Sequence, residues 1–257
     1  MINNVKYQNI PNAPCAFACH DSATGNDYYG LARSLNPVIQ LRLDVVQQAA
    51  ANVVTTLQNR EQAPDQFSVG VYQFNSSLQQ LYPSSGEAGT DLPTALRLVQ
   101  NVRNTPNLSS NGGNTDFPGA AQRLAGIVTA SGNGSTQVRA RKDLFIVTDG
   151  MEDLRTSAGS IGPMTSATNE RLCSLFWTMG FNVYVLYTPF LPLPNPYYLN
   201  TDKQYAEPTA NSPILAALRA CARYPANFFQ ASDPVAINTA MQTMLASALN
   251  SPGRISN

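Results

Sequence analysis

Three short polar segments of this sequence carry oxygen-bearing side chains of a kind that could bind a metal ion. They are His20-Asp21-Ser22-Ala23-Thr24, Gly112-Gly113-Asn114-Thr115-Asp116 and Thr148-Asp149-Gly150. The hydroxyls of Ser22, Thr24 and Thr115 and the carboxylate of Asp149 are hard oxygen ligands, which Mg²⁺ prefers. Because few of these ligands are charged, the ion would stay strongly electrophilic. We therefore expect an acidic side chain of a partner to complete its coordination.

The same residues also have a purely structural interpretation. Asp149 can simply start a turn with Gly150, and the hydroxyls can cap the helices that follow them. His20 can be a hydrogen-bonded loop histidine. From residues 148–150 alone, a turn residue and a metal ligand are equally good interpretations of Asp149.

Catalysis is a third interpretation, and it depends on His20 because the chain contains one histidine. A hydrolase would use His20 as its base, with Asp21 and a serine nucleophile. The sequence has no Gly-x-Ser-x-Gly elbow, no Walker loop and no Gly-x-Gly-x-x-Gly fingerprint. No serine is marked out as the partner of His20. We predict that the chain is not an enzyme, with the hydrolase as the alternative.

The element that must position Asp149 is the apolar run at residues 144–147. Its β-branched and aromatic residues are typical of a strand buried on both faces of a parallel sheet. In open α/β sheets, ligands bind at the carboxyl ends of such strands. Periodicity, capping residues and turn residues predict the other elements. Strands are expected at 15–19, 66–75, 181–187 and 227–230, with a hairpin arm at 76–82, and helices at 41–62, 91–103, 115–129, 165–180, 212–224 and 233–249.

Strands and helices alternate almost throughout, which predicts an α/β fold. We expect a doubly wound, mostly parallel sheet with helices on both faces and one antiparallel edge strand. A single domain is expected over residues 15–251, with an irregular arm at 1–14 and a tail at 252–257. The stretch at 189–211, rich in Pro and Tyr, is expected to be a long loop of this domain.

Composition restricts the classes of partner. Sixteen basic and sixteen acidic residues cancel, so nothing indicates a nucleic acid or an anionic membrane as ligand. Charged residues make up 12% of the chain, about half the usual share, and polar uncharged residues replace them. Such a surface favours an exported protein. No apolar run approaches the roughly 20 residues that span a bilayer. Residues 1–14 do not resemble a signal peptide, so we expect any targeting segment outside this sequence.

Four cysteines occur, and none forms a Cys-x-x-Cys pair. A structural zinc site is therefore not expected. Cys15 and Cys19 would lie about 13 Å apart on an extended strand, too far for a disulfide. Cys173 and Cys221 fall on separate expected helices and are the better disulfide candidate. Four buried free thiols remain the alternative.

The order of these motifs resembles the von Willebrand factor A (vWA) domain, a Rossmann-like fold. The resemblance covers residues from about 15 to 249 and is carried by Asn-Thr-Asp-Phe-Pro-Gly-Ala at 114–120 and Phe-Ile-Val-Thr-Asp-Gly at 145–150. More narrowly, the sequence resembles the A domain of TadG-like proteins of tight-adherence (Tad/Flp) pilus loci. That likeness lies in Cys-Ala-Phe-Ala-Cys-His-Asp-Ser at 15–22, Leu-Arg-Leu-Asp-Val-Val at 41–46, Leu-Cys at 172–173, Gly-Phe-Asn-Val-Tyr at 180–184, Leu-Arg-Ala-Cys-Ala at 218–222 and Phe-Phe-Gln-Ala-Ser at 228–232.

The resemblance implies a metal-ion-dependent adhesion site, built in the family from Asp-x-Ser-x-Ser, a threonine and an aspartate. Ser22, Thr24, Thr115 and Asp149 match these places, whereas His20 stands where the first aspartate is expected. The histidine removes a negative charge, which would weaken the binding of Mg²⁺ or shift the preference towards another divalent cation, a transition metal. Asp21 and Asp27 are the two candidates to compensate for the lost charge. The alternative is a vestigial site.

The family also implies a function and a location. We expect a non-enzymatic protein-binding or adhesion module of a bacterial envelope or pilus assembly, with protein partners. The exported chain would be periplasmic, associated with the outer membrane or at the cell surface. Contact with the membrane is expected only through a segment absent from this chain. A structural domain with a dead site is the remaining alternative.

Overall fold

A computed structural model describes residues 34–38, 40–102, 115–152, 162–163, 173–189 and 212–250 of the chain. The expected strand at 15–19, the arm at 1–14, the tail at 252–257 and nearly all of the loop at 189–211 lie outside these residues. The elements are α2 (Arg42–Arg60), β1 (Val71–Phe74), β2 (Leu78–Tyr82), α3 (Leu92–Val99), α4 (Phe117–Ile127), η2 (Gln137–Arg139), β3 (Asp143–Thr148), β4 (Met151–Glu152), β5 (Gly162–Pro163), β6 (Asn182–Tyr187), α7 (Pro213–Ala222), η4 (Pro225–Asn227), β7 (Phe228–Gln230) and α8 (Pro234–Asn250). Residues 173–178 form a further helix.

The centre of the described structure is a parallel sheet with the strand order β3-β6-β7. β3 and β6 pair in register from Asp143↔Asn182 to Thr148↔Tyr187. β1 and β2 form an antiparallel hairpin, and β4 pairs with β5. The parallel three-stranded sheet, with helices and a separate antiparallel hairpin, confirms the α/β fold class expected from the alternating pattern.

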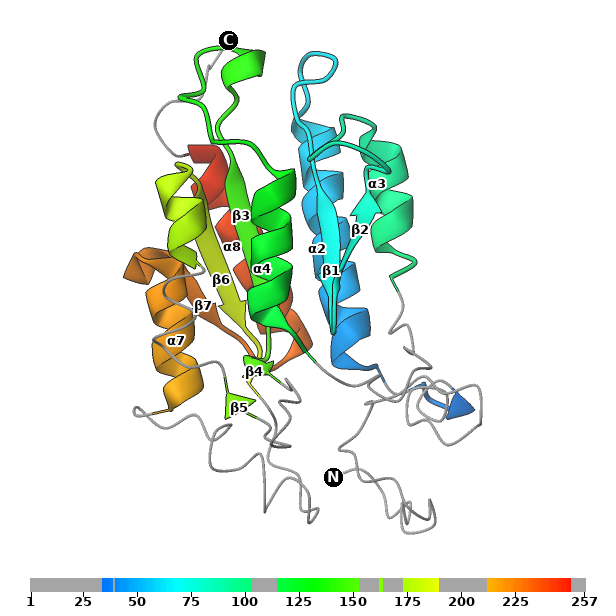
Figure 1. The fold of residues 1–257 in the computed structure, drawn as a ribbon. Helices are drawn as coiled ribbons and strands as arrows, with labels where there is room; N and C mark the ends of the chain where they lie inside the picture. The colour runs from blue at the N-terminus through cyan, green and yellow to red at the C-terminus, as the bar shows by residue number, and fades with distance from the viewer. Residues whose placement is uncertain are drawn as a thin grey trace.

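β6 shows why the sheet needs helices on both faces. Its side chains alternate between two cores: Tyr184 and Leu186 face one, and Val183, Val185 and Tyr187 face the other. All five are buried. The first core draws on α2, α3 and α8, and the second on α4, the helix at 173–178 and α7. Figure 1 shows α4 and α7 in front of the sheet and α8 behind it, which is the doubly wound arrangement. No helix in the described ranges is long and apolar enough to cross a lipid bilayer.

Two expected elements are shorter than the sequence pattern indicates. The strand expected at 66–75 is confined to Val71–Phe74. Its partner β2 ends at Tyr82 because Pro83 has no N–H to continue the ladder, and Val69 instead forms an isolated bridge with Gly89. The helix expected to reach residue 103 ends at Val99. There the Asn101 side chain donates to the carbonyl of Arg97 at 2.7 Å and satisfies one of the helix's terminal carbonyls.

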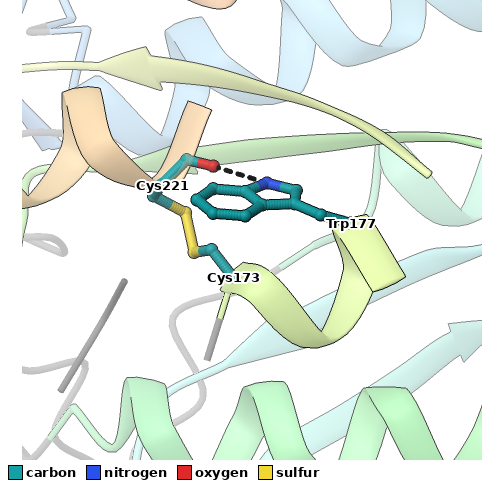
Figure 2. The surroundings of a disulfide bond; sticks show 3 residues. All are labelled: Cys173, Trp177 and Cys221. Atoms are coloured by element: carbon teal, nitrogen blue, oxygen red, sulfur yellow. Dashed lines mark hydrogen bonds between the residues drawn. A yellow bond between two sulfur atoms is a disulfide. The ribbon is translucent and has the colours of Figure 1, made fainter. Parts of the chain in front are cut away.

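The disulfide between Cys173 and Cys221 is present, with the two Cα atoms 5.1 Å apart, and confirms the expected pairing. It joins the start of the helix at 173–178 to the end of α7. Figure 2 shows Trp177 lying over this link, with its indole N–H donating to the carbonyl of Cys221 at 3.1 Å. The bond therefore fixes two helices of the same face to each other.

Candidate functional site

The carboxyl edge of the sheet brings together chain segments that are far apart in sequence. β3 and β6 end side by side, and one residue further on the N–H of Thr188 donates to the carbonyl of Thr148 at 3.0 Å. Asp149 therefore follows β3 next to Thr188, which follows β6. The helices α2, α4 and α7 begin at this same edge, at the lower end of the molecule in Figure 1. Helix N-termini carry partial positive charge, so this edge favours anions.

The turn at Asp149 depends on Gly150. The glycine has a φ of +78°, which L side chains rarely adopt. Its N–H donates to the Thr148 hydroxyl at 3.0 Å, and the N–H of Met151 donates to Asp149 Oδ1 at 3.2 Å. A Cβ on residue 150 would also overlap the Ile214 side chain of α7. The structure thus contains the turn that the sequence indicated, and this turn sets the position of the Asp149 carboxylate.

The Asp149 carboxyl has an unusual electrostatic environment. Burial raises its pKa, and the Met151 N–H and the positive charge of Arg42 offset only part of that increase, so the pKa lies above the usual value. Arg42 is the first residue of α2, and its Nη1 donates to the carbonyl of Thr188 at 3.0 Å. Burial lowers the pKa of Arg42, and the charges of Asp149 and Tyr187 partly offset this effect. A guanidinium remains charged in proteins.

Thr115 lies directly before α4 and is partly buried. The neighbouring N–H of Asp116 donates to the carbonyl of Asn75 at 2.8 Å and ties this segment to the end of β1. The Asp116 side chain accepts from the N–H of Gly119 at 2.8 Å, so it is the cap that the sequence predicted. Thr115 therefore precedes α4, and Asp149 follows β3. These two elements meet at the carboxyl edge.

The other proposed ligands, Ser22 and Thr24, together with His20 and Asp21, lie outside the described residues. Within the described ranges, no group of three His, Cys, Asp or Glu side chains could hold a metal ion. The oxygens of Thr115 and Asp149 suit Mg²⁺ in type. However, the positive charge of Arg42 acts on the same carboxylate that would bind the ion. The described residues therefore supply only part of a ligand set for Mg²⁺, with a competing positive charge nearby.

Sequence reasoning did not identify Arg42 as a site residue, because its contact is to a backbone carbonyl 146 positions away. One signal was present nonetheless. Acidic residues are favoured in the first turn of a helix and basic ones in the last, because of the helix dipole. An arginine as the first residue of a helix that begins at a ligand-binding edge departs from this rule.

No protein-family model matches the sequence, and no curated protein matches it. Solved structures do share its fold. Proximal thread matrix protein 1 (PTMP1) of the mussel byssus matches with a TM-score of 0.51 and 12% identity, over 79% of this chain and 42% of PTMP1. One PTMP1 structure, with a TM-score of 0.50, has a zinc-occupied metal-ion-dependent adhesion site. The pilus adhesin SpaC of Lactobacillus rhamnosus GG, in its open conformation, matches with a TM-score of 0.54 and 12% identity, over 80% of this chain and 28% of SpaC.

These likenesses concern the fold, since identity is low and the chain spans less than half the length of either protein. The doubly wound sheet and the carboxyl-edge turn agree with them. The chain has a von Willebrand factor A-like fold.

Proposed function

We propose that this chain is a non-enzymatic protein-binding module that uses the carboxyl edge of its sheet for adhesion or assembly. The observation that carries the proposal is the partly buried, desolvated carboxylate of Asp149, held at that edge by the Thr148–Gly150 turn beside the starts of three helices. Buried charge costs stability. Ionisable groups with perturbed pKa values occur most often at functional sites.

The names of the structural neighbours support adhesion, since SpaC is a pilus adhesin and PTMP1 a matrix protein. For this chain we infer protein partners in a bacterial envelope or pilus assembly, of the Tad/Flp type that its sequence resembles. The disulfide between Cys173 and Cys221 supports export, because disulfides persist in oxidising compartments. Periplasm, outer-membrane periphery and cell surface all meet that condition.

The proposed ligand-binding residues are Ser22, Thr24, Thr115 and Asp149, with His20 and Asp21 as further candidates. In the form closest to the family pattern, they hold a divalent cation that receives an acidic group of the partner. In the alternative form the site binds no metal. PTMP1 with its zinc-occupied site is the precedent for the first form, and the charge of Arg42 favours the second.

Site-specific photo-crosslinking in the cells that produce the protein tests the proposal. The photoreactive residue replaces exposed Pro213, the first residue of α7 at the carboxyl edge. The control position is Val138, which is 96% exposed and lies in η2 before the opposite end of β3. We expect a protein crosslinked from position 213 and not from 138, and lost on Asp149→Ala. Equal capture from both positions, or none from 213, would contradict the proposal.

The hydrolase alternative is tested separately. It requires His20 and Asp21, so a general hydrolase screen is run on the purified chain and on His20→Ala. A hydrolytic activity that the substitution abolishes would replace the binding function with an enzymatic one.

A further inference from the structure

The end of α7 carries two exposed arginines whose side chains lie over aromatic rings. The guanidinium carbon of Arg223 lies 5.6 Å from the centroid of the Trp177 ring and 5.2 Å from that of the Tyr224 ring. The guanidinium carbon of Arg219, four residues earlier, lies 5.5 Å from the centroid of the Phe228 ring. The negative potential of a ring face attracts the cation. This contact holds an arginine in place and leaves its N–H donors unused.

No acidic side chain of the described structure pairs with these two guanidinium groups, and neither group donates a hydrogen bond there. The flank is built from residues 173–189 and 212–232, and these two stretches contain no Asp, Glu or Lys. Their two arginines therefore give the flank a charge of +2, in a chain whose net charge is zero. Like charges four positions apart on a helix repel each other. An acidic group from a ligand would relieve that repulsion.

Arg223 also has an unusual backbone conformation, with a φ of +63° and a ψ of −48°. The N–H of Tyr224 donates to the carbonyl of Ala222 at 2.7 Å, so Arg223 is the central residue of a γ-turn of the rare, strained form. Glycine usually follows a helix because it adopts a positive φ without steric cost. The helix dipole favours a basic residue near this end, but Arg219 in the last turn already meets that preference. Strained residues cluster at ligand-binding positions, so the backbone marks Arg223 independently of its charge.

The two arginines and their three aromatic partners form one surface, which we call the arginine–aromatic surface: Trp177, Arg219, Arg223, Tyr224 and Phe228. Tyr224 is 52% exposed, and the other two rings are partly exposed. Trp, Tyr and Arg are the residue types that contribute most to binding energy in protein interfaces. The surface lies on the left flank of the molecule in Figure 1, at the far end of α7 from the carboxyl edge. The ten residues of α7 separate the two regions by about 15 Å.

We propose that the arginine–aromatic surface is a second protein-contact surface of this chain, which binds an acidic segment of a partner through the guanidinium of Arg223. The planar guanidinium can pair with a carboxylate through two N–H donors while its face stays on the rings. An apolar side chain next to that carboxylate packs on Tyr224. This inference does not rest on the function proposed for the carboxyl edge, and photo-crosslinking from position 213 does not test it.

The number of charges favours a protein segment over other anionic partners. Anionic membranes are recognised by clusters of about four to eight basic residues, and nucleic acids by several phosphate contacts. The arginine–aromatic surface has two arginines beside three aromatic rings. One or two carboxylates next to an apolar side chain match that composition.

Peptide selection on the purified chain tests the inference. A random-peptide phage library is depleted on immobilised Arg223→Gln and then selected on the wild type. Because depletion removes peptides that bind elsewhere, we expect the survivors to be rich in Asp and Glu with apolar neighbours. In fluorescence anisotropy, loss of the charge-assisted contact should weaken their binding to Arg223→Gln roughly ten- to a hundredfold. Arg60→Gln is the matched control and should bind like the wild type, because Arg60 is an exposed arginine in the last turn of α2.

Three results would overturn the inference: no surviving peptide, survivors without acidic enrichment, or acidic survivors that bind Arg223→Gln and the wild type equally. Arg223→Lys should bind more weakly than the wild type, since an ammonium cannot form the two-donor contact, and equal binding would reject that contact. If circular dichroism shows that Arg223→Gln is unfolded, Tyr224→Ala replaces it in depletion and titration, with the same expectations.

Two further measurements separate peptide binding from other roles of Arg223. Sedimentation with phosphatidylglycerol vesicles should show no binding, and binding that Arg223→Gln abolishes would assign the surface to a membrane instead. Arg223→Gly should melt at a higher temperature than Arg223→Gln, because glycine relieves the strained turn, and should lose peptide binding to the same extent. A glycine variant that melts no higher, or that keeps the binding, would contradict the inference that the strain is retained for binding.

Discussion

Replacing Gly150 with alanine tests how the turn next to Asp149 is held in place. The substitution has two separate costs. The left-handed backbone, with a φ of +78°, costs an alanine about 1–2 kcal/mol. The new methyl group would also overlap the Cγ2 of Ile214 and lie 3.2 Å from the Cδ1 of Leu218 on α7, and overpacking of this kind costs about 1–3 kcal/mol. We therefore expect Gly150→Ala to lower the free energy of unfolding by about 2–5 kcal/mol.

Gly86 provides a matched control, because its φ is also +78° but no atom lies within 4 Å of a Cβ built there. Gly86→Ala should show the backbone cost alone, about 1–2 kcal/mol. Urea unfolding followed by circular dichroism measures both variants. Equal destabilisation of the two would refute the argument that α7 packs tightly against the Asp149 turn.

A double-mutant cycle isolates the steric part of the effect. Ile214→Ala alone should cost about 2–5 kcal/mol, since Ile214 is fully buried. In the Gly150→Ala/Ile214→Ala variant the added methyl group occupies space that the isoleucine has left. The double variant should therefore be more stable than the sum of the single effects predicts, by about 1 kcal/mol or more. Strict additivity would show that the two side chains do not compete for space.

Three further predictions concern the rest of the fold. Replacing both Cys173 and Cys221 with serine should lower the free energy of unfolding by about 4 kcal/mol, because the disulfide closes a loop with a sequence separation of 48. Non-reducing peptide mapping of the exported protein should find the two cysteines linked. Trp177→Phe removes the donor to the Cys221 carbonyl and should cost about 1 kcal/mol in the same urea assay. Burial raises the pKa of Glu87, but hydrogen bonds from Lys142 and Thr129 together lower it by more than burial raises it. The net pKa of Glu87 is therefore below its usual value. Its stabilisation is therefore present above the unfolded-state pKa of about 4.3 and lost as the pH falls below it, and Glu87→Gln should flatten this acid arm of the stability curve.

The local features of the fold were predictable from sequence because short-range chemistry determines them. Asp91, Asp116 and Ser212 each cap the helix that follows, with a proline in its first turn. β6 was predictable because a run of apolar and β-branched residues is stable only when it is buried on both faces. The Thr148–Gly150 turn was visible in the same way, since a left-handed residue there needs glycine.

Features that depend on a partner strand were not predictable to the same degree. Residues 66–70 alternate like a strand, but β2 ends at Tyr82, so the ladder does not continue along them and Val69 alone forms a bridge, with Gly89. The relation of Arg42 to Thr188 was hidden for a similar reason. Its acceptor is a backbone carbonyl, which no residue type in a sequence marks, and this carbonyl follows β6, 146 positions further along the chain.

The position of Arg42 is difficult to explain by stability alone. Its charge is partly desolvated, which lowers its pKa, and it lies at the N-terminal start of α2, where the helix dipole disfavours a cation. The carboxylate of Asp149 is also desolvated, and the nearby charge of Arg42 does not bring its pKa back to normal. The desolvation of both groups therefore costs stability, and ionisable groups with perturbed pKa values cluster at functional sites.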